Sequence, residues 1–162
     1  MTTRWLNPDQ QLAWRAYIVG TTLLLERLDR DLRDNHQVSL PEYEILVRLS
    51  EAPERRLRMA ELADSVKNSR SRITHTITRM EREGLVDRAQ CDSDGRGVNA
   101  HLTDAGSQRL VAAAPCHVES VRACLIDLVA ADDVAAVGRV FAAVADELGT
   151  GDRDPILSPA SA

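Results

Sequence analysis

The chain has 162 residues, of which 44% are hydrophobic and 28% are charged, and its formal net charge is −5 at pH 7. This length and composition fit one globular domain, or two closely packed lobes, with a hydrophobic core. No apolar run of about 18 residues is present and the N-terminal residues lack the apolar stretch of a signal peptide, so we expect a cytoplasmic chain without a membrane-spanning helix.

The first element that the sequence predicts is a long helix. Asn7 is a favourable N-cap, Pro8 fits the first helical position, and apolar residues recur at helical spacing as far as Leu32. The predicted helix covers residues 8–34, which is long for one compact domain. We therefore expect a partner to pack along its length.

A capping box begins the second predicted helix. In Ser39-Leu40-Pro41-Glu42, the serine oxygen can accept from the glutamate amide, and the carboxylate can reach back to the serine amide. The helix is expected over residues 40–51, with Tyr43 buried, and Pro53 follows its end. Residues 54–58 are expected to form an extended link.

Two helices joined by a short turn follow this link. The first is expected over residues 59–66, and Lys67-Asn68 form the turn. Ser69 is a favourable N-cap for the second helix, over residues 70–83, and Gly84 is suited to the positive φ that often ends a helix. This order is typical of a helix-turn-helix.

After Gly84 the period of the apolar residues changes from that of a helix to that of a strand. Two short strands are predicted, at residues 85–88 and 98–102, and the turn-forming residues between them favour a hairpin. The sequence therefore predicts a mainly α fold with a small β-wing (α+β), a winged helix-turn-helix flanked by long terminal helices.

The remaining residues predict two further helices. Thr103 is expected to cap a helix over residues 104–128, and Pro115 is expected to kink it. The last helix, over residues 132–148, has an apolar stripe on one side. Residues 149–162 contain Gly, Pro and Ser and are expected to be a flexible tail.

The charge is distributed unevenly along the chain. Residues 67–82 contain five basic side chains and one acidic one, whereas residues 125–162 alone account for the net charge of −5. Because salt screens charges beyond about 10 Å, a nucleic-acid phosphate responds to the local charge and not to the total.

The helix predicted at residues 70–83 has an apolar face and an opposite face with no carboxylate until Glu81. An ordinary solvated face would mix acidic with basic residues, so this pattern favours a recognition helix in the major groove of DNA. The candidate DNA contacts are Ser69, Arg70, Ser71, Arg72, Thr74, His75, Thr78 and Arg79.

The predicted hairpin carries one arginine at its tip. Arg96 stands between two glycines, where it can enter the narrow minor groove, and Asp92 or Asp94 can hold its guanidinium by a charge-assisted hydrogen bond. Taken alone, the tip would be a simple surface turn. Next to a basic recognition helix, it predicts a second DNA contact.

Residues Leu40 to Leu110 resemble the multiple-antibiotic-resistance regulator (MarR) family. Met59-Ala-Glu-Leu-Ala63 resembles the first helix of its motif, and the segment from Ser69 to Val86 resembles its recognition helix and the start of its wing. Asp92-Ser-Asp-Gly-Arg96, followed by Leu102-Thr-Asp-Ala-Gly106, resembles its wing signature.

This resemblance implies a transcription regulator, and not an enzyme, that acts as an obligate homodimer. Residues 1–38 and 104–148 would be dimerisation helices, and residues 39–103 the DNA-binding domain. Two recognition helices about 34 Å apart would bind a pseudo-palindromic double-stranded operator. Such proteins usually repress their own and neighbouring genes.

The resemblance also implies release from DNA by a small, often aromatic or phenolic, ligand. The polar candidates for its pocket are His36, Tyr43 and Arg48; Tyr43 also fits an ordinary core position, and His36 a loop. No cofactor or metal is expected, because Cys116 and the adjacent His117 diverge by about 100° on a helix.

Two alternatives remain open at this point. Cys91, Cys116 and Cys124 would allow a thiol-based redox sensor of the same fold, although small core residues are the simpler interpretation of Cys116 and Cys124. A winged helix can also bind another protein in place of DNA.

Overall fold

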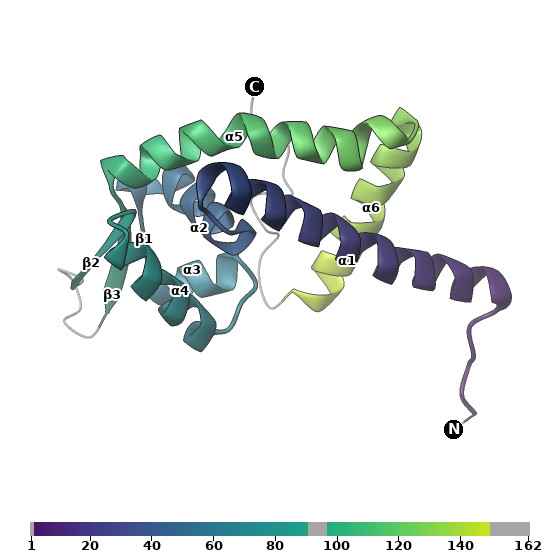
Figure 1. The fold of residues 1–162 in the computed structure, drawn as a ribbon. Helices are drawn as coiled ribbons and strands as arrows, with labels where there is room; N and C mark the ends of the chain where they lie inside the picture. The colour runs from purple at the N-terminus through teal and green to yellow at the C-terminus, as the bar shows by residue number, and fades with distance from the viewer. Residues whose placement is uncertain (1, 91–96, 150–162) are drawn as a thin grey trace.

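The computed structural model describes residues 2–90 and 97–149. Its elements are α1 (Pro8–His36), α2 (Leu40–Glu51), the 3₁₀ turn η1 (Pro53–Arg55), β1 (Arg56–Arg58), α3 (Met59–Ser65), α4 (Arg70–Arg82), β2 (Val86–Gln90), β3 (Val98–Leu102), α5 (Asp104–Cys124), the 3₁₀ turn η2 (Ile126–Leu128) and α6 (Ala131–Leu148). We call α2 to β3 the winged-helix lobe, and α1, α5 and α6 the helical arm (Figure 1). The mainly α fold with a small β-wing is confirmed.

The predicted caps are present at the helix ends. Asn7 Oδ1 accepts from the amide of Gln10 at 2.9 Å at the start of α1, and Ser39 and Glu42 form the capping box of α2. Gly84 ends the turn after α4 with a φ of 72°. Such local signals explain why the starts of these helices could be located from the sequence.

The winged-helix lobe has a closed apolar core. Leu46, Leu62 and Met80 come from three different helices and are each 0% exposed, and Leu102 of the sheet, which packs against them, is 1% exposed. The sheet is antiparallel with strand order β1-β3-β2, so β3 pairs with both other strands. Each element thus buries one apolar face against the others.

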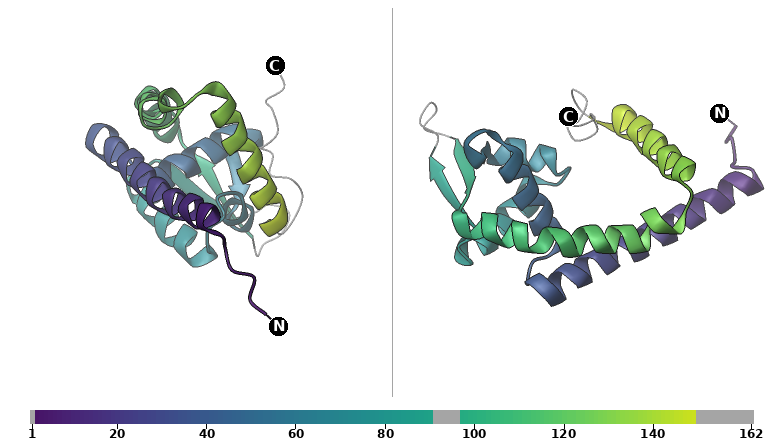
Figure 2. Two further views of the ribbon diagram at one scale, coloured as in Figure 1. Left: turned by 90° about the vertical axis from the view of Figure 1, so that its right-hand side faces the viewer. Right: turned by 90° about the horizontal axis from the view of Figure 1, so that it is seen from above.

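The helical arm has little core of its own. Helices α1 and α5 run side by side, and α1 extends well beyond the lobe, as the right view of Figure 2 shows. Helix α6 has no buried residue, and its Phe141 ring meets Tyr17 of α1 at 5.2 Å between centroids. In the described part of the chain, no helix is long and apolar enough to span a membrane.

Several predicted boundaries are corrected by the structure. The helix expected over residues 104–128 ends at Cys124, because Leu125 leaves the helical region with φ −140° and ψ −63°. Helix α5 continues through Pro115 as one helix. The link at residues 54–58 contains η1 and β1, which adds a third strand to the predicted hairpin. Most of the predicted tail, residues 150–162, lies outside the described residues.

Candidate nucleic-acid interface

A short turn sets the positions of α3 and α4. Lys67 has a φ of 50°, and its amide donates to the Asp64 carbonyl at 3.2 Å. Ser69 Oγ accepts from the amide of Arg72 at 3.3 Å, as an N-cap does. Because these bonds satisfy groups at both helix ends, the first turn of α4 is held in a defined place.

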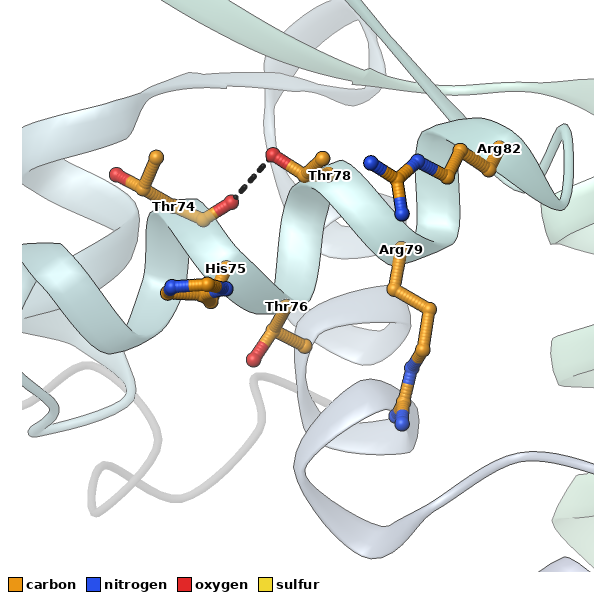
Figure 3. Close-up of a pocket in the computed structure, with 6 residues that line it drawn as sticks. All are labelled: Thr74, His75, Thr76, Thr78, Arg79 and Arg82. Carbon is orange, nitrogen blue, oxygen red and sulfur yellow. Dashed lines mark hydrogen bonds between the residues drawn. The ribbon is translucent and has the colours of Figure 1, made fainter.

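Helix α4 presents a polar face on an apolar support. Ile73, Ile77 and Met80 are buried in the core, and no acidic residue lies in the first turn. The opposite side chains are exposed or half-exposed: Ser69, Arg70, Ser71, Arg72, Thr74, His75 and Thr78. Along this helix lies a groove of about 530 Å³, which is lined by Thr74, His75, Thr76, Thr78, Arg79 and Arg82 (Figure 3).

The threonine hydroxyls of α4 already donate to the helix backbone. Thr74 Oγ1 donates to the Arg70 carbonyl at 2.8 Å, and Thr78 Oγ1 donates to the Thr74 carbonyl at 2.8 Å. With their hydrogens used in this way, the two hydroxyls can still accept a hydrogen bond, which suits the amino groups of adenine or cytosine. Donors for phosphate oxygens must come mainly from the arginines of this face.

The one carboxylate within residues 67–82 is paired. Glu81 Oε2 accepts from Arg88 of β2, at 3.0 Å from Nε and 2.5 Å from Nη2. The hydrogen bond from Arg88 lowers the pKa of Glu81 and keeps it ionised next to its counter-ion. The negative charge of Glu81 is therefore largely offset on the side that faces the wing.

A second groove joins α4 to the wing. It has a volume of about 530 Å³ and is lined by Arg58, Met59, Ala60, Arg70, Thr74, Arg88, Gly97 and Val98. Arg58 and Arg88 were missed by the sequence analysis because neither lies on the recognition helix. Their signal is weak: both are basic residues in short strands, and only the pairing of β3 with β1 and β2 brings them together.

Arg79 differs from the other predicted contacts. Its Nε donates to Glu42 Oε1 at 2.6 Å and its Nη2 donates to Ser39 Oγ at 3.2 Å, both in the capping box of α2. In Figure 3 its side chain points away from those of Thr78 and Arg82. Among the wing-tip predictions, Asp92, Asp94, Arg96 and also Cys91 lie outside the described residues.

A cavity of about 480 Å³ lies where α1, α2 and α5 meet the turn after α3. It is lined by Leu25, Leu28, Leu40, Tyr43, Glu44, Val47, Arg48, Ser65, Val66, Lys67 and His117. Two of the predicted ligand residues, Tyr43 and Arg48, are among them. His36 is not; its carbonyl accepts from Arg109 Nη1 at 2.9 Å.

His117 is one of the lining residues of this cavity that the sequence analysis did not predict. Its ring lies against that of Tyr43, 4.5 Å between centroids, and its Nδ1 is buried with no hydrogen-bond partner in the described structure. Burial lowers the pKa of His117. In the sequence, His117 stands out only as a histidine next to a cysteine. Its contact with Tyr43 could not be seen there, because Tyr43 belongs to a distant element.

The thiols of α5 are partly buried. Cys116 and Cys124 are not in a disulfide, and Cys116 Sγ lies 4.0 Å from the Asp31 carbonyl. Within residues 2–90 and 97–149, no three His, Cys, Asp or Glu side chains are grouped so that they could hold a metal ion.

Comparisons with known proteins agree with this architecture. The model of the MarR family matches residues 38–98, and no curated protein matches the sequence. Sco3205 from Streptomyces coelicolor, a MarR family transcriptional regulator solved in complex with DNA, is 41% identical. The match covers 94% of this chain and 96% of that chain, with a TM-score of 0.89.

Two more structures from Streptomyces coelicolor are similar. The MarR family transcriptional regulator AbsC is 42% identical, over 90% of this chain and 98% of that chain, with a TM-score of 0.85. The transcriptional regulator PcaV, solved with its natural ligand, is 24% identical over 90% and 98%, with a TM-score of 0.69, and shares the fold. The chain belongs to the MarR family of transcriptional regulators.

Proposed function

We propose that this chain is a repressor that binds a pseudo-palindromic DNA operator as a homodimer and is released by a small aromatic or phenolic effector. The observation that carries the DNA-binding part is the outer face of α4. It is basic, has no acidic residue in its first turn, and lies on three buried apolar side chains. Electrostatic attraction of this kind supplies most of the non-specific affinity for DNA.

The proposed DNA contacts divide by chemistry. Arg70 and Arg72, in the first turn of α4, carry donors that suit guanine edges or phosphates. Ser71, Thr74, His75 and Thr78 extend the same face, and the cap residue Ser69 lies at its start. Arg96 is proposed for the minor groove, with Asp92 and Asp94 as its supports, on the basis of the sequence.

The proposed dimer explains the exposed apolar residues of the helical arm. Leu12, Val111 and Leu148 are 70%, 70% and 75% exposed, although each lies in a helix with an apolar pattern. Exposed apolar patches of this kind mark interaction surfaces in soluble proteins. A second copy of the chain would cover them, with residues 1–38 and 104–148 as dimerisation helices and residues 39–103 as the DNA-binding domain.

The proposed effector site is the cavity beside Tyr43 and His117. Two aromatic rings and several aliphatic side chains line it, with Arg48 and Lys67 as its basic residues and Glu44, whose pKa burial raises, as its acidic residue. That composition suits an aromatic ring with one polar or anionic group. PcaV, which has the same fold, was solved with its natural ligand, so ligand binding occurs on this architecture.

A gel-shift titration tests the DNA claim. The wild-type chain is mixed with the DNA upstream of its own coding region at several salt concentrations, with an unrelated duplex as control. We expect a specific shift whose affinity falls steeply with salt, about 10³-fold or more between 50 and 200 mM for six or more phosphate contacts. Absence of a shift at low salt would favour a winged helix that binds protein.

A panel of benzoates and phenols, added to the preformed complex, tests the effector claim. Compounds that fit the cavity should release the DNA and raise the melting temperature of the free protein. Tyr43→Ala should abolish release while the free variant still binds the operator. Release that persists in Tyr43→Ala would place the effector elsewhere.

A further inference from the structure

The carboxylate of Glu42 is buried and completely engaged. Its side chain is 3% exposed, and Oε2 accepts from Ser39 N at 2.8 Å and from Ser39 Oγ at 2.6 Å. Oε1 accepts from Arg79 Nε at 2.6 Å and is also paired with Arg79 Nη2. A buried carboxylate is stable only with a counter-ion. The ion pair with Glu42 therefore keeps the Arg79 side chain in this position.

The geometry of this contact needs an arginine. One guanidinium reaches both Glu42 and the hydroxyl of Ser39, with two of its nitrogens. The planar group fixes direction as well as distance, which a lysine ammonium cannot do. A move of Arg79 toward DNA would leave the buried carboxylate of Glu42 without its counter-ion, bonded only to Ser39. Its place on the recognition helix therefore does not make it a DNA contact.

Apolar packing and the Ser69 cap hold α4 on the core, and a directional bond farther along the helix constrains its orientation more tightly. Ile73, Ile77 and Met80 hold α4 on the core, but hydrophobic contact has no preferred direction along or around a helix. Base readout demands side chains placed within about 0.5 Å. A directional ion pair between α4 and α2 supplies the constraint that the apolar side lacks.

The same turn of α2 is attached to the helical arm. Leu40 N donates to Asp29 Oδ1 at 2.8 Å, and Asp29 Oδ2 accepts from Arg33 Nε at 2.6 Å. Burial raises the pKa of Asp29, but the bonds from Arg33 and Leu40 and the charge of Arg79 outweigh it and lower the pKa overall. The first turn of α2 thus lies in a continuous network from α1 to α4.

We propose that Arg79 is a positioning residue, whose ion pair with Glu42 fixes the rotation and axial position of α4 relative to α1 through the first turn of α2. The inference rests on the proposed DNA binding. It replaces the sequence-based assignment of Arg79 as a DNA contact. In a dimer joined through α1, the pair would also set the spacing between the two recognition helices.

The test is a double-mutant cycle with Arg79→Gln, Glu42→Gln and the variant that carries both. Arg82→Gln is the matched control, because it removes an arginine from the same helix without unpairing Glu42. Affinity is measured against the strongest upstream duplex and an unrelated duplex at four or more salt concentrations. Urea unfolding and circular dichroism are recorded for every variant.

We expect both single variants to weaken specific binding about tenfold or more. The salt slope and the affinity for the unrelated duplex should stay as in the wild type, because no phosphate contact is removed. The double variant should bind the specific duplex at least as well as either single variant, because no charge is left unpaired. Arg82→Gln, at a groove-lining position, should affect the specific and the unrelated duplex equally, with a matching change in the salt slope.

Three outcomes would overturn the proposal. In the first, Arg79→Gln reduces the salt slope by about one and weakens all sequences equally while Glu42→Gln binds normally, which makes Arg79 a phosphate contact. In the second, the losses of specific binding free energy in the two single variants add up in the double variant. In the third, all variants bind like the wild type.

Failure of the proposed function gives a different result. Wild-type protein that binds no duplex at low salt would contradict DNA binding itself. The urea-unfolding data would still test the ion pair: non-additive losses of unfolding free energy support the pair, and additive losses overturn it. If a single variant does not fold, folding of the double variant supports the pairing, and its specific affinity then tests the positioning role.

Discussion

The winged-helix lobe and the helical arm bury their apolar residues to very different degrees. Helix α2 is short and has four buried apolar residues, whereas α1 is much longer and has two, Leu28 and Leu32, both near its C-terminal end. Helix α6 has none. The arm helices nevertheless carry large apolar side chains, among them Leu12, Val111 and Val140, which stay exposed in the single chain.

The comparison shows that the apolar side chains of the winged-helix lobe are covered within one chain, whereas those of the helical arm are not. The core of the lobe is closed within this chain by the lobe's helices and sheet together with Leu32 of α1 and Ala113 of α5. The arm exposes Trp14, Tyr17, Val118 and Val140, which a lone soluble chain would gain free energy by burying. A second copy, with the same faces exposed, is the partner that we propose.

The largest expected effect comes from a charge on the apolar stripe of α6. Val144→Asp should weaken the dimer at least about 100-fold, because the carboxylate would be buried without a partner. Ala135→Asp, on the opposite side of the same helix, is the control and should leave the dimer intact. Sedimentation velocity over a concentration series measures both. Equal effects of the two variants would remove α6 from the interface.

Removing the same group from the two regions should give different kinds of loss. Leu46→Ala, at a fully buried position, should lower the free energy of unfolding by about 2–5 kcal/mol. Leu12→Ala, at an exposed position of α1, should raise the dissociation constant of the proposed dimer, whereas Leu46→Ala should leave that constant nearly unchanged. Urea unfolding measures the loss at Leu46, and sedimentation velocity over a concentration series measures dissociation. An unchanged dissociation constant for Leu12→Ala would argue against the dimer.

A substitution on the recognition face should affect binding alone. Arg72→Ala should cost about 1–3 kcal/mol in operator affinity and relax specificity at one position, while the mass of the dimer and the unfolding curve stay unchanged. Binding to a set of single-base operator variants, measured by fluorescence anisotropy, shows this. An equal loss on every sequence would reassign Arg72 to a phosphate.

The smallest effect is expected where α5 of the arm packs on α2 of the lobe. Burial lowers the pKa of His117 below its ordinary 6.5, so the histidine is neutral in the folded state at pH 7. Its contribution to stability is complete above pH 6.5 and is lost as the pH falls through the lowered folded-state pKa.

His117→Phe keeps a ring against Tyr43 but cannot take up a proton. We expect this variant to lose less stability than the wild type when the pH falls below 6.5, with urea unfolding as the measurement. His75→Gln controls for the loss of an exposed imidazole. Parallel pH profiles for wild type and His117→Phe would contradict a buried neutral His117.

The sequence predicted best what is determined locally. Asn7, Ser39 and Ser69 mark helix starts through bonds to residues three positions away, so the pattern alone located them. The end of α5 was missed because the apolar period continues beyond Cys124, while the backbone leaves the helix at Leu125. Strand β1 is too short for a periodic signal and exists through its pairing with β3.

The tertiary contacts of the candidate sites could not be predicted in the same way. The capping box of Ser39 and Glu42 was visible, but its pairing with Arg79 joins α2 to α4. The contact of Tyr43 with His117 likewise joins distant parts of the chain. Such contacts follow from how elements pack, and a single sequence carries no direct signal for them.

The most direct test of the comparison between lobe and arm is the mass of the free wild-type protein in solution. Light scattering coupled to size exclusion, at micromolar concentrations, should give twice the chain mass of 17.9 kDa. This mass should stay constant as the protein is diluted, down to concentrations near the dissociation constant of the dimer. A stable monomer of 17.9 kDa at all concentrations would contradict the account, because the apolar faces of α1, α5 and α6 would then have no partner.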